Sequence, residues 1–196
     1  MVEVSLHADK PAIRALGISE SFVKRRSKKS VLAGVVMRGD GIVDGFSFAD
    51  ITVGGMDATE GVLKLYRGLK RDDINLILLN GCIIAWYNVI DLNKVHKETG
   101  LPIIAVTYEE SAGLEGHFRR NFPEDWRERV KVYRGNKGRE EVTLKTGYRV
   151  FVRFLGMSGE DAKRVLNRFT VQGSVSEPLR VARLLARSLV KEGRVP

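Results

Sequence analysis

The sequence contains few residues of several kinds, and each shortage excludes a class of protein. Its 196 residues include one cysteine, Cys82, which excludes an internal disulfide framework and a zinc site built on cysteines. The longest strongly apolar stretch, Leu76–Trp86, is interrupted by Asn80 and Gly81. It is far shorter than the roughly 18–20 residues that span a bilayer. Residues 1–10 carry acids and no apolar run, so no secretory signal is expected. We expect a soluble, cytoplasmic protein.

Amide side chains are also scarce, with seven asparagines and one glutamine, whereas charged residues make up 29% of the chain. This composition favours a thermophilic origin, because charge-rich chains with few amides are common in thermophiles. Lysine and arginine number 33 and aspartate and glutamate 24, which gives a net charge of +9. Such an excess favours a polyanionic partner, nucleic acid first, although a solvated thermophile surface has the same composition.

The hydrophobic pattern of residues 12–108 is typical of an α/β core. Buried runs predict five strands, at residues 13–18, 30–37, 42–51, 74–79 and 102–107. Asp40-Gly41 is a strong turn signal, so the first three strands are predicted to form an antiparallel meander. Helical spacing predicts helices that begin at Asp57 or Thr59 and at Asn88, the second ending before Gly100. The order βββαβαβ predicts one mixed sheet with helices on both faces, in which the first strand lies beside the parallel strand 74–79.

The remaining residues predict additions to this core rather than a second domain. Residues 109–156 are predicted to form an insertion, with polar helices within 112–133 followed by a β-hairpin of residues 140–145 and 148–155. Two helices are then expected at residues 159–169 and 177–191, within a C-terminal segment of about residues 157–192. We see no repeat or interdomain linker, so residues 1–196 are predicted to form a single domain.

No complete catalytic motif is present: the sequence has no Walker-type loop, no dinucleotide-binding glycine pattern and no nucleophile elbow. In an α/β sheet, ligands usually bind at the carboxyl ends of the strands. Glu20 follows the first strand, while Asp57 and Glu60 begin the first helix. These three acids could hold Mg²⁺ or Mn²⁺ for phosphodiester cleavage. The alternative is that Asp57 and Glu60 are there because acids are favourable at a helix N-terminus.

Several short strings resemble endonuclease V, in the same order along the chain. They are ATEG at 58–61, LNG at 79–81, LPIIAVT at 101–107 and EPLRVA at 177–182. The whole chain is similar, over about residues 12–190, to an archaeal family of unknown function that is related to endonuclease V. The strings that support this resemblance are GI-x-E-S, G-x-D-A-T-E and EPLR-x-A, the last two of which overlap strings given above. The resemblance implies a ribonuclease H-like fold and, for endonuclease V itself, cutting of nucleic acid with deaminated adenine by acid-bound Mg²⁺.

The functional residues of endonuclease V are only partly matched. Its metal-binding acids fall on Ser19, Glu60 and Asn80, and its active-site lysine falls on Tyr108. Residues 51–54 stand where it carries an aromatic wedge. Glu60 is therefore the one matched metal ligand, and neutral ligands suit Mg²⁺ poorly. We expect a nucleic-acid-binding protein without strong nuclease activity. The alternatives are a metal-dependent endonuclease with a rearranged centre and a protein-interaction scaffold for an acidic partner.

Two basic segments could contact nucleic acid. The first lies between the first two predicted strands and contains Lys24, Arg25, Arg26, Lys28 and Lys29. It would flank the carboxyl end of the sheet and could contact phosphates, or it could be a solvated turn. The second lies in the insertion, where basic residues interleave with aromatic ones: Arg119, Arg120, Arg127, Arg129, Arg134, Phe118, Trp126 and Tyr133. These side chains could stack on bases or could pack the helices onto the sheet.

Overall fold

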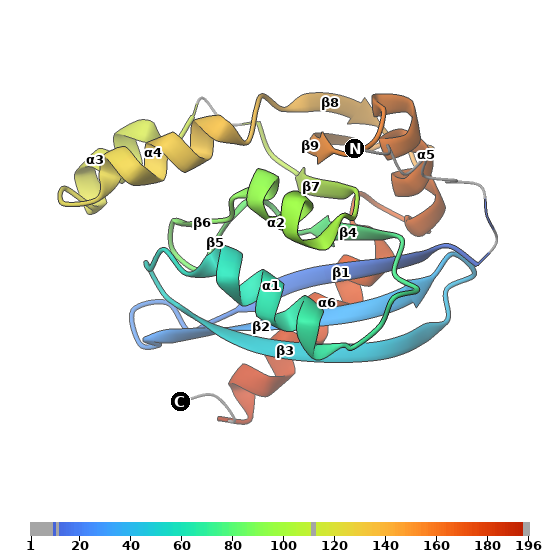
Figure 1. Ribbon diagram of the computed structural model, residues 1–196, viewed down its shortest axis with the longest axis horizontal. Helices are drawn as coiled ribbons and strands as arrows, with labels where there is room; N and C mark the ends of the chain where they lie inside the picture. The colour runs from blue at the N-terminus through green and yellow to red at the C-terminus, as the bar shows by residue number, and fades with distance from the viewer. Residues whose placement is uncertain (1–9, 11, 111–112, 194–196) are drawn as a thin grey trace.

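A seven-stranded mixed sheet forms the centre of the molecule (Figure 1). The computed structural model describes residue 10, residues 12–110 and residues 113–193. The strands of this sheet are β1 (Arg14–Ser21), β2 (Lys29–Arg38), β3 (Val43–Thr52), β4 (Leu76–Leu79), β7 (Ile103–Thr107), β8 (Glu140–Thr143) and β9 (Arg149–Leu155). Their spatial order is β3-β2-β1-β4-β7-β9-β8. The antiparallel β1–β2–β3 meander and the parallel β1–β4 pair confirm the predicted layout.

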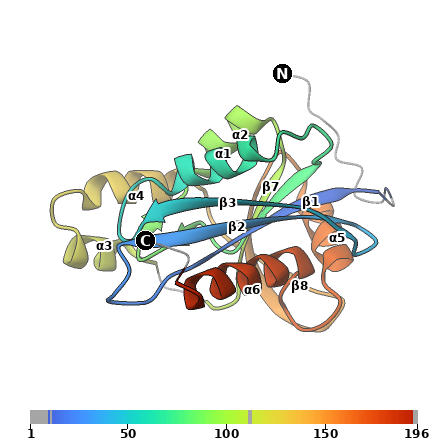
Figure 2. The same cartoon turned by 90° about the horizontal axis from the view of Figure 1, so that it is seen from below.

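Helices cover both faces of the sheet, as predicted (Figure 2). On one face, α1 (Ala58–Gly68) and α2 (Leu92–Thr99) pack over side chains of β1, β2, β3 and β4. On the other face lie α5 (Gly159–Phe169) and α6 (Glu177–Lys191), whose bounds agree with the sequence prediction. We call these the α1 face and the α6 face. Among the described residues, no helix is long and apolar enough to cross a membrane.

The segment after β4 differs from the prediction. The helix expected from Asn88 begins at Leu92, because Asp91 caps it by accepting a hydrogen bond from the Lys94 amide. Residues before this cap form a small hairpin, β5 (Ile83–Ile84) and β6 (Asn88–Val89). Asn88 is fully buried and bonds to neighbouring loops instead of entering the helix. A strand of two residues is too short to leave a periodic pattern in the sequence.

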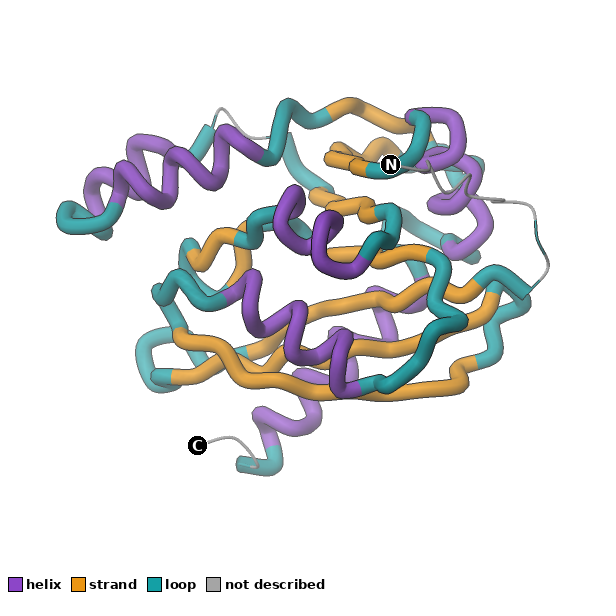
Figure 3. Tube along the Cα trace, viewed as in Figure 1, coloured by secondary structure: helices purple, strands orange, loops and turns teal. Residues whose placement is uncertain are grey.

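The segment predicted as an insertion divides into two parts. Helices α3 (Glu115–Asn121) and α4 (Trp126–Gly135) form an arm that extends beyond the sheet (Figures 1 and 3). The hairpin β8–β9 instead joins the main sheet, because β9 pairs antiparallel with β7. Ala112, the first residue of the predicted helical segment, lies outside the described residues, as do both ends of the predicted 1–196 domain.

A close contact between α6 and β1 positions the C-terminal helix. Gly17 lies in β1 directly under Pro178, in the first turn of α6. A Cβ atom at residue 17 would be 2.5 Å from the carbonyl carbon of Pro178. The helix can approach the strand this closely because glycine has no side chain.

We expect Gly17→Ala to lower the free energy of unfolding by about 1–3 kcal/mol, since the added methyl group overlaps backbone that cannot move independently. The measurement is denaturant unfolding at equal m-value. Gly116→Ala in α3 is the matched control, because nothing lies within 4 Å of the position of its Cβ. That variant should be neutral or slightly stabilised. Equal stability of Gly17→Ala and the native protein would contradict the tight contact.

Candidate functional site

Three parallel strands, β1, β4 and β7, end at one edge of the sheet, and the residues that follow them line a cavity of about 370 Å³. We call it the strand-end cavity. Its lining includes Glu20 from β1, Asn80 after β4, Tyr108 after β7, and Arg183 and Arg187 from α6. The sequence predicts strands that end shortly before Glu20, Asn80 and Tyr108. A carboxylate, an amide, a phenol and two guanidinium groups therefore border one space.

Ser19 and Glu20 point to opposite faces of the sheet, as the alternation of a β-strand requires. The Ser19 hydroxyl, which is buried on the α6 face, donates a 3.0 Å hydrogen bond to the Leu179 carbonyl. Glu20 points the other way and accepts a 2.8 Å hydrogen bond from the Ser30 hydroxyl and a 3.4 Å bond from the Ala85 amide. The hydroxyl of Ser19 is thus used in fixing α6 to β1.

The Glu20 carboxyl group is held in an unfavourable environment for its charge. Burial raises its pKa above the ordinary value of 4.5, and the hydrogen bonds from Ser30 and Ala85 and the charge of Arg183 only partly offset this effect. A carboxyl group whose pKa is raised by burial, in a cavity at the end of a central strand, is a candidate functional group.

Tyr108 is the other perturbed group of the strand-end cavity. Burial raises the pKa of Tyr108 to about 12, so its hydroxyl is neutral. That hydroxyl is buried and has no hydrogen-bond partner among the described residues. A buried polar atom without a partner calls for a bound water or ligand.

The side chains of Asp57 and Glu60 are bonded to partners outside the strand-end cavity. Asp57 accepts hydrogen bonds from the amide and hydroxyl of Thr52 and from the Asn88 side chain. Burial opposes ionisation of Asp57, but these bonds outweigh it and lower its pKa. The exposed Glu60 carboxylate pairs with Lys94 on α2, which lowers the pKa of Glu60. Neither acid lines the strand-end cavity.

These positions do not fit a metal centre of the endonuclease V kind. Within the described ranges, no group of three or more histidine, cysteine, aspartate or glutamate side chains could hold a metal ion. Of the positions expected to match, Ser19 is bonded to α6 and Glu60 to Lys94. A catalytic role for Glu20, Asp57 and Glu60 as one cluster remains only a prediction from the sequence.

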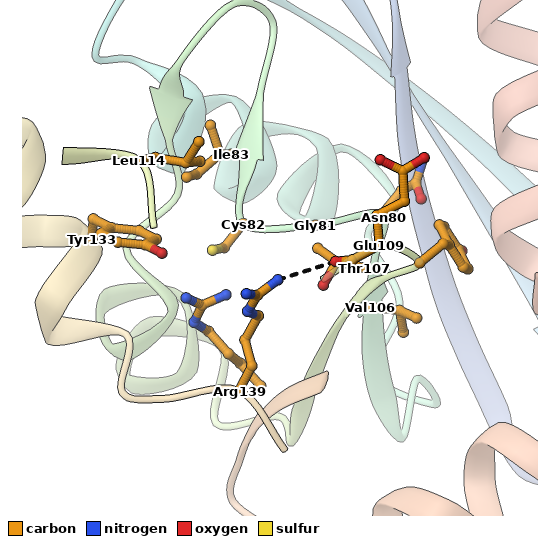
Figure 4. Close-up of a pocket in the computed structure, with 12 residues that line it drawn as sticks. Asn80, Gly81, Cys82, Ile83, Val106, Thr107, Glu109, Leu114, Tyr133 and Arg139 are labelled. Atoms are coloured by element: carbon orange, nitrogen blue, oxygen red, sulfur yellow. Dashed lines mark hydrogen bonds between the residues drawn. The ribbon is translucent and has the colours of Figure 1, made fainter. Parts of the chain in front are cut away.

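A second cavity, of about 380 Å³, lies between the strand ends and the arm (Figure 4). We call it the arm cavity. Asn80 and Tyr108 line both cavities, and the arm cavity adds Tyr133, Arg139 and Arg153. Arg139 reaches across it and donates a 3.3 Å hydrogen bond to the Glu109 carbonyl, drawn as a dashed line in Figure 4. Arg153 is only 7% exposed and lies over the Tyr133 ring. This cavity is also cationic.

The basic segment after β1 lies at the same edge of the sheet. Four of its five cations are exposed, namely Lys24, Arg25, Arg26 and Lys28. Lys29 belongs to β2 instead, and its ammonium donates a 3.0 Å hydrogen bond to the Thr52 hydroxyl. Four cations therefore project into solvent beside the strand-end cavity.

The basic residues of the arm divide between surface and interior. Arg119 and Arg120 are exposed, and Arg119 lies over the Trp126 ring at 4.6 Å. Arg129, which the sequence could not distinguish from the others, is 2% exposed and pairs with Asp125. Phe118 is fully buried. The arm thus has a cationic outer surface and an arginine in its base.

Sequence reasoning missed the contribution of α6 to the site. Arg183 and Arg187 are one helical turn apart, so they share one face of α6, but this spacing alone does not show which way that face points. The burial of Arg153 likewise leaves no signal in the sequence, because its partners come from other elements.

The architecture defines an endonuclease V-like fold of the ribonuclease H-like class. Endonuclease V from Streptomyces avermitilis has a TM-score of 0.65 to this chain at 20% identity, over 94% of this chain and 84% of that one. Endonuclease V from Ciona intestinalis, in complex with DNA containing an inosine, has a TM-score of 0.62 at 13% identity, over 92% and 87%. At these identities the similarity establishes the fold.

Residues 11–190 match the family described as Endonuclease dU, and the chain belongs to that family. Archaeal relatives named UPF0215 protein include one from Pyrobaculum calidifontis, 34% identical over 87% of this chain and 93% of that protein. Another, from Thermococcus gammatolerans, is 33% identical over 92% and 94%. The crystal structure of a protein of unknown function from Archaeoglobus fulgidus has a TM-score of 0.77 at 25% identity, over 91% and 98%.

The raised pKa of Glu20 predicts how stability depends on pH. The folded state binds this proton more tightly than the unfolded state, so stability falls as pH rises from 4.5 through the raised pKa. Glu20→Gln removes the buried charge and should unfold at a higher denaturant concentration than the native protein at neutral pH. The difference should shrink as pH falls below 4.5. A variant less stable at neutral pH would show that the charge of Glu20 stabilises the fold.

Proposed function

We propose that this chain binds a nucleic-acid strand across the carboxyl ends of β1, β4 and β7, without strong metal-dependent nuclease activity. The observation that carries this proposal is the convergence of cations on one edge of the sheet. Arg183 and Arg187 line the strand-end cavity, and Arg139 and Arg153 line the arm cavity. Two adjoining cavities with paired guanidinium groups suit consecutive phosphates, which arginine binds bidentately.

The exposed cations around this edge extend the proposed surface. They are Lys24, Arg25, Arg26 and Lys28 of the β1–β2 loop, with Arg119 and Arg120 of the arm. Lys29 contributes charge from within β2. The Ciona intestinalis endonuclease V, which has a similar fold, is in complex with DNA in its crystal structure. We infer that nucleic acid follows this edge of the sheet here, because the cations lie there.

The weak cutting follows from the chemistry of the matched positions. Mg²⁺ retains its waters and binds to carboxylates in preference to neutral oxygens. Ser19 and Asn80 are neutral, and the Glu60 carboxylate is paired with Lys94. Phosphoryl transfer needs positive charge held against the developing oxyanion, and this set of ligands holds a metal poorly.

A second candidate function is cleavage of strands that contain deoxyuridine. Two observations favour it: the description of the family as Endonuclease dU, and the Glu20 carboxyl group beside Asn80 in the strand-end cavity. In this case Glu20, and not Glu60, would be the acid in contact with the substrate. Because burial raises its pKa, the Glu20 carboxyl group exchanges its proton at a higher pH than an ordinary glutamate does, which suits a proton-transfer role.

The binding proposal predicts a dependence on salt. We expect the affinity for single-stranded oligonucleotides to fall steeply with salt. Replacement of Arg25, Arg26 and Lys28 by alanine should reduce the log–log slope by about 0.7 for each phosphate that the loop no longer neutralises. A control with equal loss of charge replaces Lys64, Lys70 and Lys163, exposed lysines of α1, the loop after it and α5. It should leave the slope nearly unchanged. Equal slopes in the two triple variants would show that the loop is a solvated turn that contacts no phosphate.

A cleavage assay separates the two candidate functions. Strands with one inosine or one deoxyuridine are incubated with the native protein and Mg²⁺ or Mn²⁺, and products are resolved by length. We expect no specific cutting, because the matched acids are incomplete. Metal-dependent cutting at deoxyuridine that is lost in Glu20→Gln and kept in Glu60→Gln would establish the second candidate. If cutting is instead lost in Glu60→Gln, Glu60 is the required acid, as in the arrangement of endonuclease V.

A further inference from the structure

The turn between β5 and β6 presents one aromatic side chain to solvent at the edge that carries the site. Trp86 is 40% exposed, whereas its neighbour Ala85 is 1% exposed and Asn88 is fully buried. A tryptophan buries more apolar surface than almost any other residue, so an exposed one beside a cationic cavity is informative. The chain has one other tryptophan, Trp126 of the arm.

The backbone of this turn is strained. Ala85, Trp86 and Tyr87 have φ values of 42°, 62° and 66°, three successive left-handed conformations without a glycine. Side chains with a Cβ atom adopt this conformation at a cost in free energy, and such strain persists where the surroundings enforce it. In a turn that only joins two strands, glycine or asparagine at these positions would adopt the left-handed conformation at a lower cost in free energy.

Hydrogen bonds hold the turn on both sides of Trp86. The Ala85 amide donates to Glu20, and the Ala85 carbonyl accepts a 2.8 Å bond from the Gly54 amide. The Tyr87 carbonyl accepts a 2.8 Å bond from Arg129. Residues 85 and 87 are thus anchored to the site, the β3–α1 loop and the arm, and the residue between them is left to project.

A positive charge, which would attract a phosphate, lies next to the indole ring of Trp86. The Lys24 ammonium is 5.1 Å from the centre of the Trp86 ring. Lys24 belongs to the exposed basic loop, and Ala85, the residue before Trp86, bonds to the Glu20 carboxylate of the strand-end cavity. An aromatic face, an exposed cation and a cationic cavity therefore lie next to one another in space. These are the components of a site for unpaired nucleotides.

We propose that Trp86 is a stacking platform for an unpaired base of the bound strand, with Lys24 contacting the phosphate of the same or the next nucleotide. This inference rests on the proposed function and adds to it the class of substrate: a strand with at least one unstacked base rather than an intact duplex. The strained turn then has a physical role, since it holds the indole ring outward before the strand arrives and so reduces the entropy cost of binding.

The test uses the full chain with Trp126→Phe as the parent, so that Trp86 is the one tryptophan. Its fluorescence is followed during titration with a mixed-sequence single strand and with an abasic strand of equal length, which has the same phosphates and no bases. We expect quenching by the first strand only. Trp86→Ala in the parent should bind the normal strand about 5- to 150-fold more weakly, with an unchanged salt slope and unchanged affinity for the abasic strand. Trp86→Phe should recover most of the affinity.

The outcomes separate the two proposals. If the parent binds the normal strand but its fluorescence does not change and Trp86→Ala binds equally well, the stacking role is wrong and the binding function stands. If neither the native protein nor the parent binds either strand at low salt, the proposed function fails, and the platform with it. Equal weakening of Trp86→Ala towards both strands would show a structural role for the turn and would also overturn the platform.

Discussion

A single buried guanidinium group holds the loops of the site together. Arg129 projects from α4 and donates hydrogen bonds to the carbonyls of Gly54, Gly55 and Tyr87, while its charge is paired with Asp125. It also lies 3.8 Å from the centre of the Phe122 ring. A charge this deeply buried is tolerated only when its donors are satisfied, so the β3–α1 loop, the β5–β6 turn and the arm are held as one unit. Removal of one acceptor would leave part of this charge buried and unpaired.

The alternation of β1 places the contacts with α6 on one face of the sheet and the contacts with the β5–β6 turn on the other. Odd residues meet α6, where Gly17 allows close approach and the Ser19 hydroxyl is bonded to the helix. Glu20 points to the α1 face and contacts the β5–β6 turn. Because a side chain cannot serve both faces, a serine at position 19 fastens α6 and leaves Glu20 as the ionisable group of the strand end. The alternation of β1 therefore makes Glu20, and not residue 19, the side chain that contacts the β5–β6 turn.

Much of the fold could be predicted because it depends on local signals. Ser158 and Pro178 mark the starts of α5 and α6, and these helices have the predicted bounds. The β5–β6 turn could not be predicted, since three left-handed residues without glycine are favoured only by distant partners. Arg129 could not be told from Arg127 for the same reason. The position of the site at the strand ends could be predicted from the topology. The direction in which the arginines of α6 point could not, because it depends on how that helix is rotated over the sheet.

The distribution of charge at the site is the reason why we propose nucleic-acid binding without strong metal chemistry for this endonuclease V-like fold. Phosphates are attracted by the sum of nearby cations, and many different arrangements of arginine supply it. A metal centre instead needs several carboxylates within a few ångströms of one point, so replacement of a single acid impairs it. Here the cations surround both cavities, while Asp57 and Glu60 have taken partners within the fold. Glu20 lines the strand-end cavity as an acid whose neutral form is favoured by burial, and under our second proposal it is the acid in contact with the substrate.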